Sequence, residues 1–227
     1  MTQDLAHKRP YLLASLIAGI SFPATWLFLP LDGGLIALVW KMAGVGLLVP
    51  FALHRHHVGE FVPLAIILAF YALGDGLIEF SMVAGALAFA VGHLVAIWLY
   101  FRHRRVAPTF SQKLLAIAIF LLTPVIAYGL PPTTDEAVQV AAYSVILAAM
   151  AAMAWSSNFP RYRVGIGAVL FVISDLLIFA ELGPLANSKV SGIAIWYLYY
   201  FGVLMIAVGV AQTLVKRGHY PEGEERD

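Results

Sequence analysis

Two aspartates, Asp75 and Asp175, interrupt strongly apolar stretches of the chain and are the side chains best suited to chemistry. A charged residue at the centre of a membrane helix costs about 2.5–3.5 kcal/mol on insertion scales, so each is a candidate functional group with a partner to be found. Burial in a medium of low dielectric constant, and a second carboxylate nearby, both favour a carboxyl group that keeps its proton. The pair therefore indicates general acid and base chemistry, with the two roles not yet assigned.

Other ionisable residues share these apolar stretches. Lys41 and His93 lie well inside them, whereas Glu79 and Glu181 lie nearer their ends. Structural alternatives remain open for each. Either aspartate could neutralise Lys41 and fix the register of two helices, His93 could be a hydrogen-bonded interior residue, and Glu181 could be only a helix end. Lys41 is then a buried counter-ion in one interpretation and a phosphate ligand in the other.

The composition requires a membrane environment around most of the chain. Of 227 residues, 61% are hydrophobic and only 12% are charged, whereas soluble proteins carry roughly 25% charged residues. Cysteine is absent, which excludes disulfides, a thiol nucleophile and thiolate metal sites. The net charge of +1 argues against a nucleic-acid partner, and no cofactor is expected.

A membrane-spanning helix needs roughly 20 apolar residues, and eight such runs use nearly the whole sequence. We predict one all-α integral membrane domain over residues 1–227, with a short polar tail at 216–227 and no separate soluble domain. The predicted spans are Tyr11–Leu29, Gly34–Leu53, Phe61–Phe80, Val83–Phe101, Lys113–Leu130, Glu136–Trp155, Val164–Leu182 and Ile193–Val215.

Lysine and arginine predict the orientation of these spans, because short cytoplasmic loops are enriched in both. If both termini are cytoplasmic, twelve of the fourteen Lys and Arg residues fall on that side, Lys189 falls on the other, and Lys41 lies within a span. The twelve are Lys8, Arg9, Arg55, Arg102, Arg104, Arg105, Lys113, Arg161, Arg163, Lys216, Arg217 and Arg226.

The third and seventh predicted spans share a weak sequence similarity. The sequence LGDGL at 73–77 is similar to ISDLL at 173–177, one hundred residues later. With four spans between equivalent points, a duplication would give two parallel four-helix repeats, an architecture known among membrane proteins. Chance similarity is the alternative.

The polar residues of several predicted spans fall at a similar depth. At a rise of 1.5 Å per residue, they lie about 8–15 Å below the predicted non-cytoplasmic ends. They are Lys41, Asp75, His93, Tyr143, Asp175 and Tyr199. Glu79 shares a helix face with Asp75, and Tyr200 shares one with Trp196. We expect one polar layer in the non-cytoplasmic half, with Trp98, Tyr100, Trp155 and Trp196 as interfacial anchors.

Three motifs of this layer resemble a known family. The run YALGD ending at Asp75, the pair Gly92-His93 and the run GAVLFVISD ending at Asp175 resemble the YhhN family of lysoplasmalogenases, which includes transmembrane protein 86. The resemblance covers nearly the full chain and implies an eight-span plan. Lys41, Tyr143 and the pair Tyr199-Tyr200 occupy spans where that family also carries a lysine or tyrosines.

The sequence departs from the family pattern at three positions. Met42 stands where a proline commonly follows the lysine, Ala96 replaces a tyrosine, and Val203 stands in place of a glutamine. These departures bear on the choice of substrate and on activity, and they leave both aspartates in place.

The resemblance implies hydrolysis of the vinyl ether bond of a lysoplasmalogen to a fatty aldehyde and glycerophosphoethanolamine or glycerophosphocholine. Such a bond breaks when an acid protonates the alkene carbon and water captures the oxocarbenium ion, a task suited to Asp75 and Asp175 as catalytic residues. Lys41 would bind the phosphate as a point charge. The remaining candidate substrate-binding residues are Glu79, His93, Tyr143, Tyr199 and Tyr200.

Three other functions use the same residues. A proton-coupled transporter or channel would use the Asp, Lys and His layer as a relay. A zinc hydrolase would usually need three protein ligands, of which His93 is the only histidine within a span. A non-catalytic scaffold would explain the missing family residues. Nothing resembles an organellar transit peptide, so we expect a bacterial plasma membrane, with the bilayer and a lysophospholipid as partners.

Overall fold

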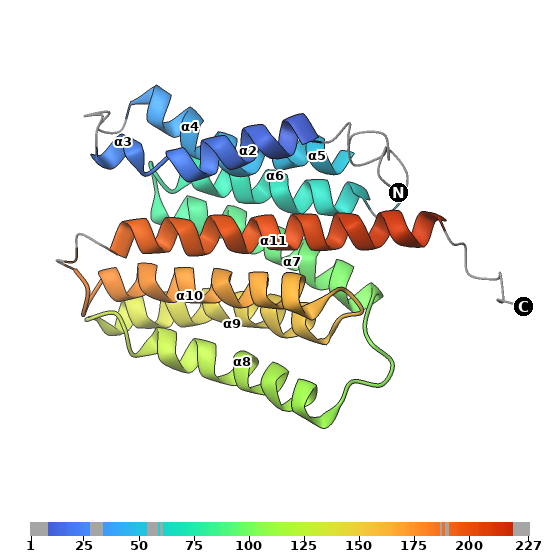
Figure 1. Cartoon of the computed structure of the whole chain (residues 1–227). Helices are drawn as coiled ribbons and strands as arrows, with labels where there is room; N and C mark the ends of the chain where they lie inside the picture. Colours follow the sequence, from blue (N-terminus) through green and yellow to red (C-terminus); the bar gives the residue numbers. More distant parts are fainter. Residues whose placement is uncertain are drawn as a thin grey trace, which may run out of the picture.

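The computed structural model describes residues 9–27, 34–53, 59, 61–186, 188 and 191–219, and it is built of helices (Figure 1). Within these residues the only strand-like pairing is an isolated bridge between Arg104 and Ser157. The helices are α2 (Arg9–Ser21), α3 (Ala24–Leu27), α4 (Leu35–Gly46), α5 (Leu48–Leu53), α6 (Phe61–Leu77), α7 (Met82–Arg102), α8 (Phe110–Tyr128), α9 (Thr134–Ser156), η1 (Arg161–Gly165), α10 (Ile166–Glu181) and α11 (Ser191–His219). The predicted all-α class is confirmed for the described part.

Six apolar helical segments are long enough to cross a membrane. They are Leu35–Leu53, Met82–Arg102, Phe110–Tyr128, Thr134–Ser156, Arg161–Glu181 and Ser191–Arg217. Two further apolar segments, Pro10–Trp26 and Phe61–Leu77, are shorter and reach about 25 Å at 1.5 Å per residue, against a hydrocarbon core of about 30 Å. The chain is a multi-pass membrane protein, and the count of eight spans stays a prediction.

The outer surface of the bundle is apolar, as a lipid-facing surface must be. Leu35, Ile17 and Val125 expose 74%, 70% and 68% of their areas. On α8 only Gln112, Thr123 and Ala127 are buried, so this helix lies at the periphery and presents most of its apolar side chains outward. Exposed apolar area on this scale marks contact with lipid rather than with water.

Prolines break two of the predicted spans into shorter helices. Proline has no N–H to donate, and its ring clashes with the carbonyl four residues earlier. Pro50 therefore cannot bond to the carbonyl of Gly46, and α4 ends at that residue before α5 begins at Leu48. Pro23 lies likewise between α2 and α3, so the predicted span Tyr11–Leu29 is two helices over its described residues.

The two ends of the bundle differ in charge. The Arg105 guanidinium donates to the Ser157 carbonyl at 3.2 Å, the Asn158 N–H donates to the His103 carbonyl at 2.7 Å, and Arg217 bonds to the His103 ring at 2.6 Å. These contacts join the end of α7, the α9–η1 connection and the end of α11 into what we call the basic end (Figure 1).

The opposite end, which we call the far end, holds the connections that follow α6, α8 and α10 (Figure 1). The charge segregation matches the predicted one for the described residues. Lys8, Arg55, Lys189 and Arg226, which entered the same argument, lie outside them. Which end faces the cytoplasm stays a prediction.

Candidate functional site

A cavity of about 270 Å³ lies between α3, α4, α6, α7, α9, α10 and α11, toward the far end of the bundle. Its polar lining residues are Lys41, Asp75, Glu79, Tyr143, Ser174, Asp175, Glu181 and Tyr199. Asp75 and Asp175 are only 3% and 6% exposed, whereas Trp26 and Met82 on the same lining are about half exposed. The cavity therefore leads from an open mouth to two buried carboxyl groups.

Asp75 is fixed by a tyrosine from another helix. It lies two residues before α6 ends at Leu77, and the Tyr199 hydroxyl of α11 donates to its Oδ2 at 2.9 Å. Gly74 precedes it, and a Cβ at that glycine would come within 2.8 Å of the Phe89 ring on α7. A small residue at this position lets the two helices approach closely, and that approach brings Asp75 to the cavity wall.

Asp175 is held in the same way from the other side of the bundle. The Tyr143 hydroxyl of α9 donates to its Oδ2 at 2.8 Å. The neighbouring Ser174 hydroxyl donates to the carbonyl of Ile195 at 3.0 Å, which ties α10 to α11 beside the carboxyl group. Each aspartate thus accepts one tyrosine hydroxyl, and both line one cavity.

His93 lies behind this wall and does not line the cavity. It is fully buried, with Nδ1 at 2.8 Å from the Tyr71 hydroxyl and Nε2 at 3.2 Å from the Tyr143 hydroxyl. Because Tyr143 gives its hydrogen to Asp175, its oxygen accepts from Nε2–H, and Nδ1 accepts from Tyr71. A one-way chain of hydrogen bonds therefore runs from Tyr71 through His93 and Tyr143 to Asp175.

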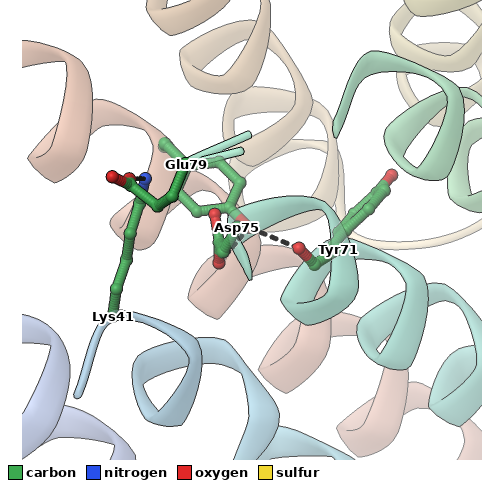
Figure 2. Close-up of polar contacts among 5 residues, drawn as sticks. Lys41, Tyr71, Asp75 and Glu79 are labelled. Atoms are coloured by element: carbon green, nitrogen blue, oxygen red, sulfur yellow. Dashed lines mark hydrogen bonds and ion pairs between the residues drawn. The ribbon is translucent and has the colours of Figure 1, made fainter. Parts of the chain in front are cut away.

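Lys41 and Glu79 form an ion pair at the mouth. Their charged atoms are 2.5 Å apart, and their side chains are 15% and 45% exposed. Figure 2 shows this ion pair on the side of Asp75 that faces away from Tyr71. Glu79 follows Asp75 by four residues, about one helical turn. The ion-pair partner of Lys41 is thus a glutamate and not one of the aspartates.

The two tyrosines predicted together at 199 and 200 have different surroundings. Tyr199 lines the cavity, but the Tyr200 hydroxyl lies 3.1 Å from Ser15 Oγ, and its ring stacks on Trp196. Tyr200 therefore joins α11 to α2 and stands outside the lining. The prediction that Tyr100 and Trp196 are interfacial anchors is wrong, since they are 0% and 3% exposed.

Glu181 is a lining residue that sequence reasoning treated as a helix end. Its carboxylate accepts a hydrogen bond from Ser191 Oγ, and it shares the cavity with Asp175. The available signal is the spacing of Ser174, Ile178 and Glu181, which at i, i+4 and i+7 share one face of α10. The helical periodicity of α10 therefore places Glu181 on the same face as Ser174, next to Asp175 in the sequence.

The described residues offer no ready-made metal site. Among them no three His, Cys, Asp or Glu side chains lie close enough together to hold a metal ion. His93 bonds to tyrosines through both ring nitrogens, so it is already engaged. The zinc interpretation finds no ligand set here.

Comparison with known proteins gives one match. The sequence model of the YhhN family matches residues 36–210, a range that contains both aspartates, Lys41 and the three tyrosines of the network, Tyr71, Tyr143 and Tyr199. No curated protein and no solved structure matches the chain.

Proposed function

Because the chain belongs to the YhhN family, we propose that it is an intramembrane hydrolase that cleaves the vinyl ether bond of lysoplasmalogens. The products are a fatty aldehyde and glycerophosphoethanolamine or glycerophosphocholine. One observation carries the proposal: two buried aspartates, each fixed by a tyrosine, line one cavity that has a lysine at its mouth.

The geometry suits acid-initiated cleavage. One carboxyl group gives its proton to the alkene carbon remote from the ether oxygen, which leaves an oxocarbenium ion. The second carboxylate stabilises that cation and takes a proton from the attacking water. The resulting hemiacetal gives its hydroxyl proton to the first carboxylate, while the second carboxyl group protonates the departing glycerol oxygen. Both aspartates return to their starting states, and the overall reaction adds one water and releases an aldehyde and an alcohol.

The tyrosines orient the two carboxyl groups for this task. Tyr199 and Tyr143 each donate to an Oδ2 atom, and within the described residues no other hydrogen bond to either aspartate is found. The Oδ1 atoms of Asp75 and Asp175 therefore remain available to the substrate or to water. Because the tyrosines are themselves buried or half-buried, the carboxyl groups are held in place before the substrate enters.

The rest of the cavity fits a single-chain lipid with a phosphate. Apolar side chains such as Phe89, Ile178 and Phe179 line the wall and suit the alkenyl chain, whose tail would lie between the helices. Lys41 has three N–H donors, and Glu79 occupies one of them. The remaining two N–H donors of Lys41 would bind the phosphate oxygens, and the ion pair with Glu79 would hold the Lys41 ammonium group in position.

The proposal extends to the membrane. We infer eight spans, with the two shorter apolar segments, Pro10–Trp26 and Phe61–Leu77, completing the set by local thinning of the bilayer, which costs a fraction of a kcal/mol per ångström of mismatch. With the basic end cytoplasmic, both termini face the cytoplasm and the cavity opens in the other half of the membrane. A bacterial plasma membrane is the proposed location.

The test is aldehyde release by the purified protein in detergent, with no ion gradient present. A run in D₂O with immediate reduction of the product should place one deuterium on the carbon next to the former aldehyde carbon. Saturated ether lysolipid, which has no alkene carbon to protonate, should bind without being cleaved. Absence of aldehyde from every vinyl ether lysolipid would refute the proposal.

One observation favours a second candidate, a proton-coupled transporter. The hydrogen-bond chain from Tyr71 to Asp175 has the form of a proton relay within a membrane. The two functions separate in sealed vesicles: transport requires a gradient across the membrane, whereas hydrolysis proceeds in detergent without one.

A further inference from the structure

Glu181 is a cavity carboxylate that the proposed acid and base chemistry does not use. It is the last residue of α10, where the helix dipole disfavours a negative charge, so it does not stabilise its own helix. Its partner is the Ser191 hydroxyl, and no described lysine, arginine or histidine pairs with it. A carboxylate in that position has room for a cation from outside the protein.

Aromatic rings share the cavity with this carboxylate. Gly192 follows Ser191, and a Cβ at this glycine would lie 3.8 Å from Cζ3 of Trp26. The Phe22 ring stands between Trp26 and Trp196, at centroid distances of 5.0 and 4.6 Å. Both tryptophans line the cavity with Glu181. Indole faces attract ammonium groups, and quaternary ammonium ligands are commonly bound by such rings.

The charges of the mouth indicate the kind of headgroup that fits. Besides the two catalytic aspartates, the cavity lining has one cation, Lys41, and two further carboxylates, Glu79 and Glu181. A headgroup with phosphate alone would gain from Lys41 and be repelled by the second carboxylate. A zwitterionic headgroup offers phosphate to Lys41 and an ammonium to Glu181, so that Glu181 gains a cation and Lys41 is shared by Glu79 and the phosphate.

We propose that Glu181 and the half-exposed ring of Trp26 form an ammonium subsite that selects zwitterionic lysophospholipids over purely anionic ones, with the buried Trp196 ring as part of the wall behind them. The inference rests on the proposed function for its substrate, and it adds the residues that recognise the amine. Ethanolamine bonds to the Glu181 carboxylate through N–H donors. Choline has no such donors and depends more on the indole faces.

Binding measurements test the subsite without turnover. Saturated ether lysolipids that carry ethanolamine, choline or a bare phosphate are titrated by calorimetry into the detergent-solubilised protein. Glu181→Gln should weaken binding of the ethanolamine lipid about tenfold, the worth of one hydrogen bond to a charged group, and leave the bare phosphate lipid unchanged or bound more tightly. Trp26→Leu should weaken choline binding more than ethanolamine binding.

Asp135→Asn is the matched control. Asp135 is an exposed acid in the first turn of α9 at the same end of the bundle and stands outside the cavity lining, so its loss should change binding of none of the three lipids. A melting temperature of Glu181→Gln near that of the wild type shows that the variant is folded. If it is not, Glu181→Asp, which keeps the charge, should preserve the ranking of the three lipids.

The outcomes separate the two proposals. An equal loss of affinity for all three lipids, or none for the amine lipids, overturns the subsite even if aldehyde is released. Release of no aldehyde from any vinyl ether lipid overturns the hydrolase, whereas selective loss of amine binding would still establish the subsite.

Discussion

Tyr199 on α11 donates its hydroxyl hydrogen to Asp75 on α6 at 2.9 Å, so a helix near the end of the chain orients a carboxyl group contributed by an early one. Tyr143 stands in the same relation to Asp175. This paired arrangement distinguishes the two aspartates from incidental buried acids.

Replacing Tyr199 with Phe should lower kcat about 10–100-fold and change KM little, because the ring keeps its packing while Asp75 loses the bond that fixes Oδ2. Steady-state kinetics of aldehyde release measures the split. Tyr197→Phe is the matched control, since Tyr197 bonds only to a backbone carbonyl and its contact is exposed. A variant whose KM rises while kcat holds would assign Tyr199 to substrate binding instead.

Lys41→Ala should raise KM about tenfold or more with a smaller change in kcat, because a charge-assisted bond to phosphate is lost. Glu79 then stands unpaired at the mouth and repels the phosphate further. Lys41→Arg, which keeps the charge, should recover most of the affinity. An unchanged KM with a lost kcat would contradict the role of Lys41 in binding the headgroup.

His93→Phe should lower the melting temperature and kcat together and leave KM close to that of the wild type. Removal of the imidazole leaves the buried Tyr71 hydroxyl without its acceptor, at a cost of about 1–3 kcal/mol. Tyr143 keeps its bond to Asp175 but loses the N–H that donates to its oxygen. Kinetics and thermal melting in the same detergent check this. A selective rise in KM would place His93 in contact with the substrate, against its position behind the cavity wall.

Gly74→Ala should destabilise the protein by about 1–3 kcal/mol, because the new methyl group would stand 2.8 Å from the Phe89 ring and force α6 and α7 apart. Thermal melting in detergent measures the loss. Gly34→Ala, with nothing within 4 Å of the added carbon, is the control and should melt like the wild type. Equal melting temperatures for the two variants would show that α6 and α7 tolerate separation.

Hydropathy predicts most of the helices, because the bilayer admits few backbone structures. The eight apolar runs are largely helical over their described residues, but two of them are divided into shorter helices, and six segments are long enough to cross a membrane. The helix breaks near Pro23 and Pro50 could have been predicted from the disruptive effect of proline inside a helix. Hydropathy alone does not show them, because both prolines lie within continuous apolar runs. The depth estimate grouped Lys41, Asp75 and Asp175 because the rise per residue is constant along a helix. The three residues line one cavity, and their depth in a bilayer stays a prediction.

The sequence could not predict the hydrogen-bond and ion-pair partners of the polar residues, because the depth of a residue does not give the direction in which its side chain leaves the helix. Tyr199 and Tyr200 are adjacent and point to different neighbours, and only the packing of α11 against α2 and α6 separates them. For the same reason the sequence suggested an aspartate as the partner of Lys41, whereas its ion-pair partner is Glu79. Glu181 and Trp196 were likewise not predicted to line the cavity.

The most direct test of the account is aldehyde release by Asp75→Asn and Asp175→Asn beside the wild type, in detergent, with melting temperatures measured on the same samples. Asparagine keeps the shape and can still accept from each tyrosine, but it can neither give a proton nor carry a negative charge. We predict that both variants stay folded, bind saturated ether lysolipid and release no aldehyde above background. Wild-type turnover by either folded variant would contradict the shared catalytic role of the two carboxyl groups.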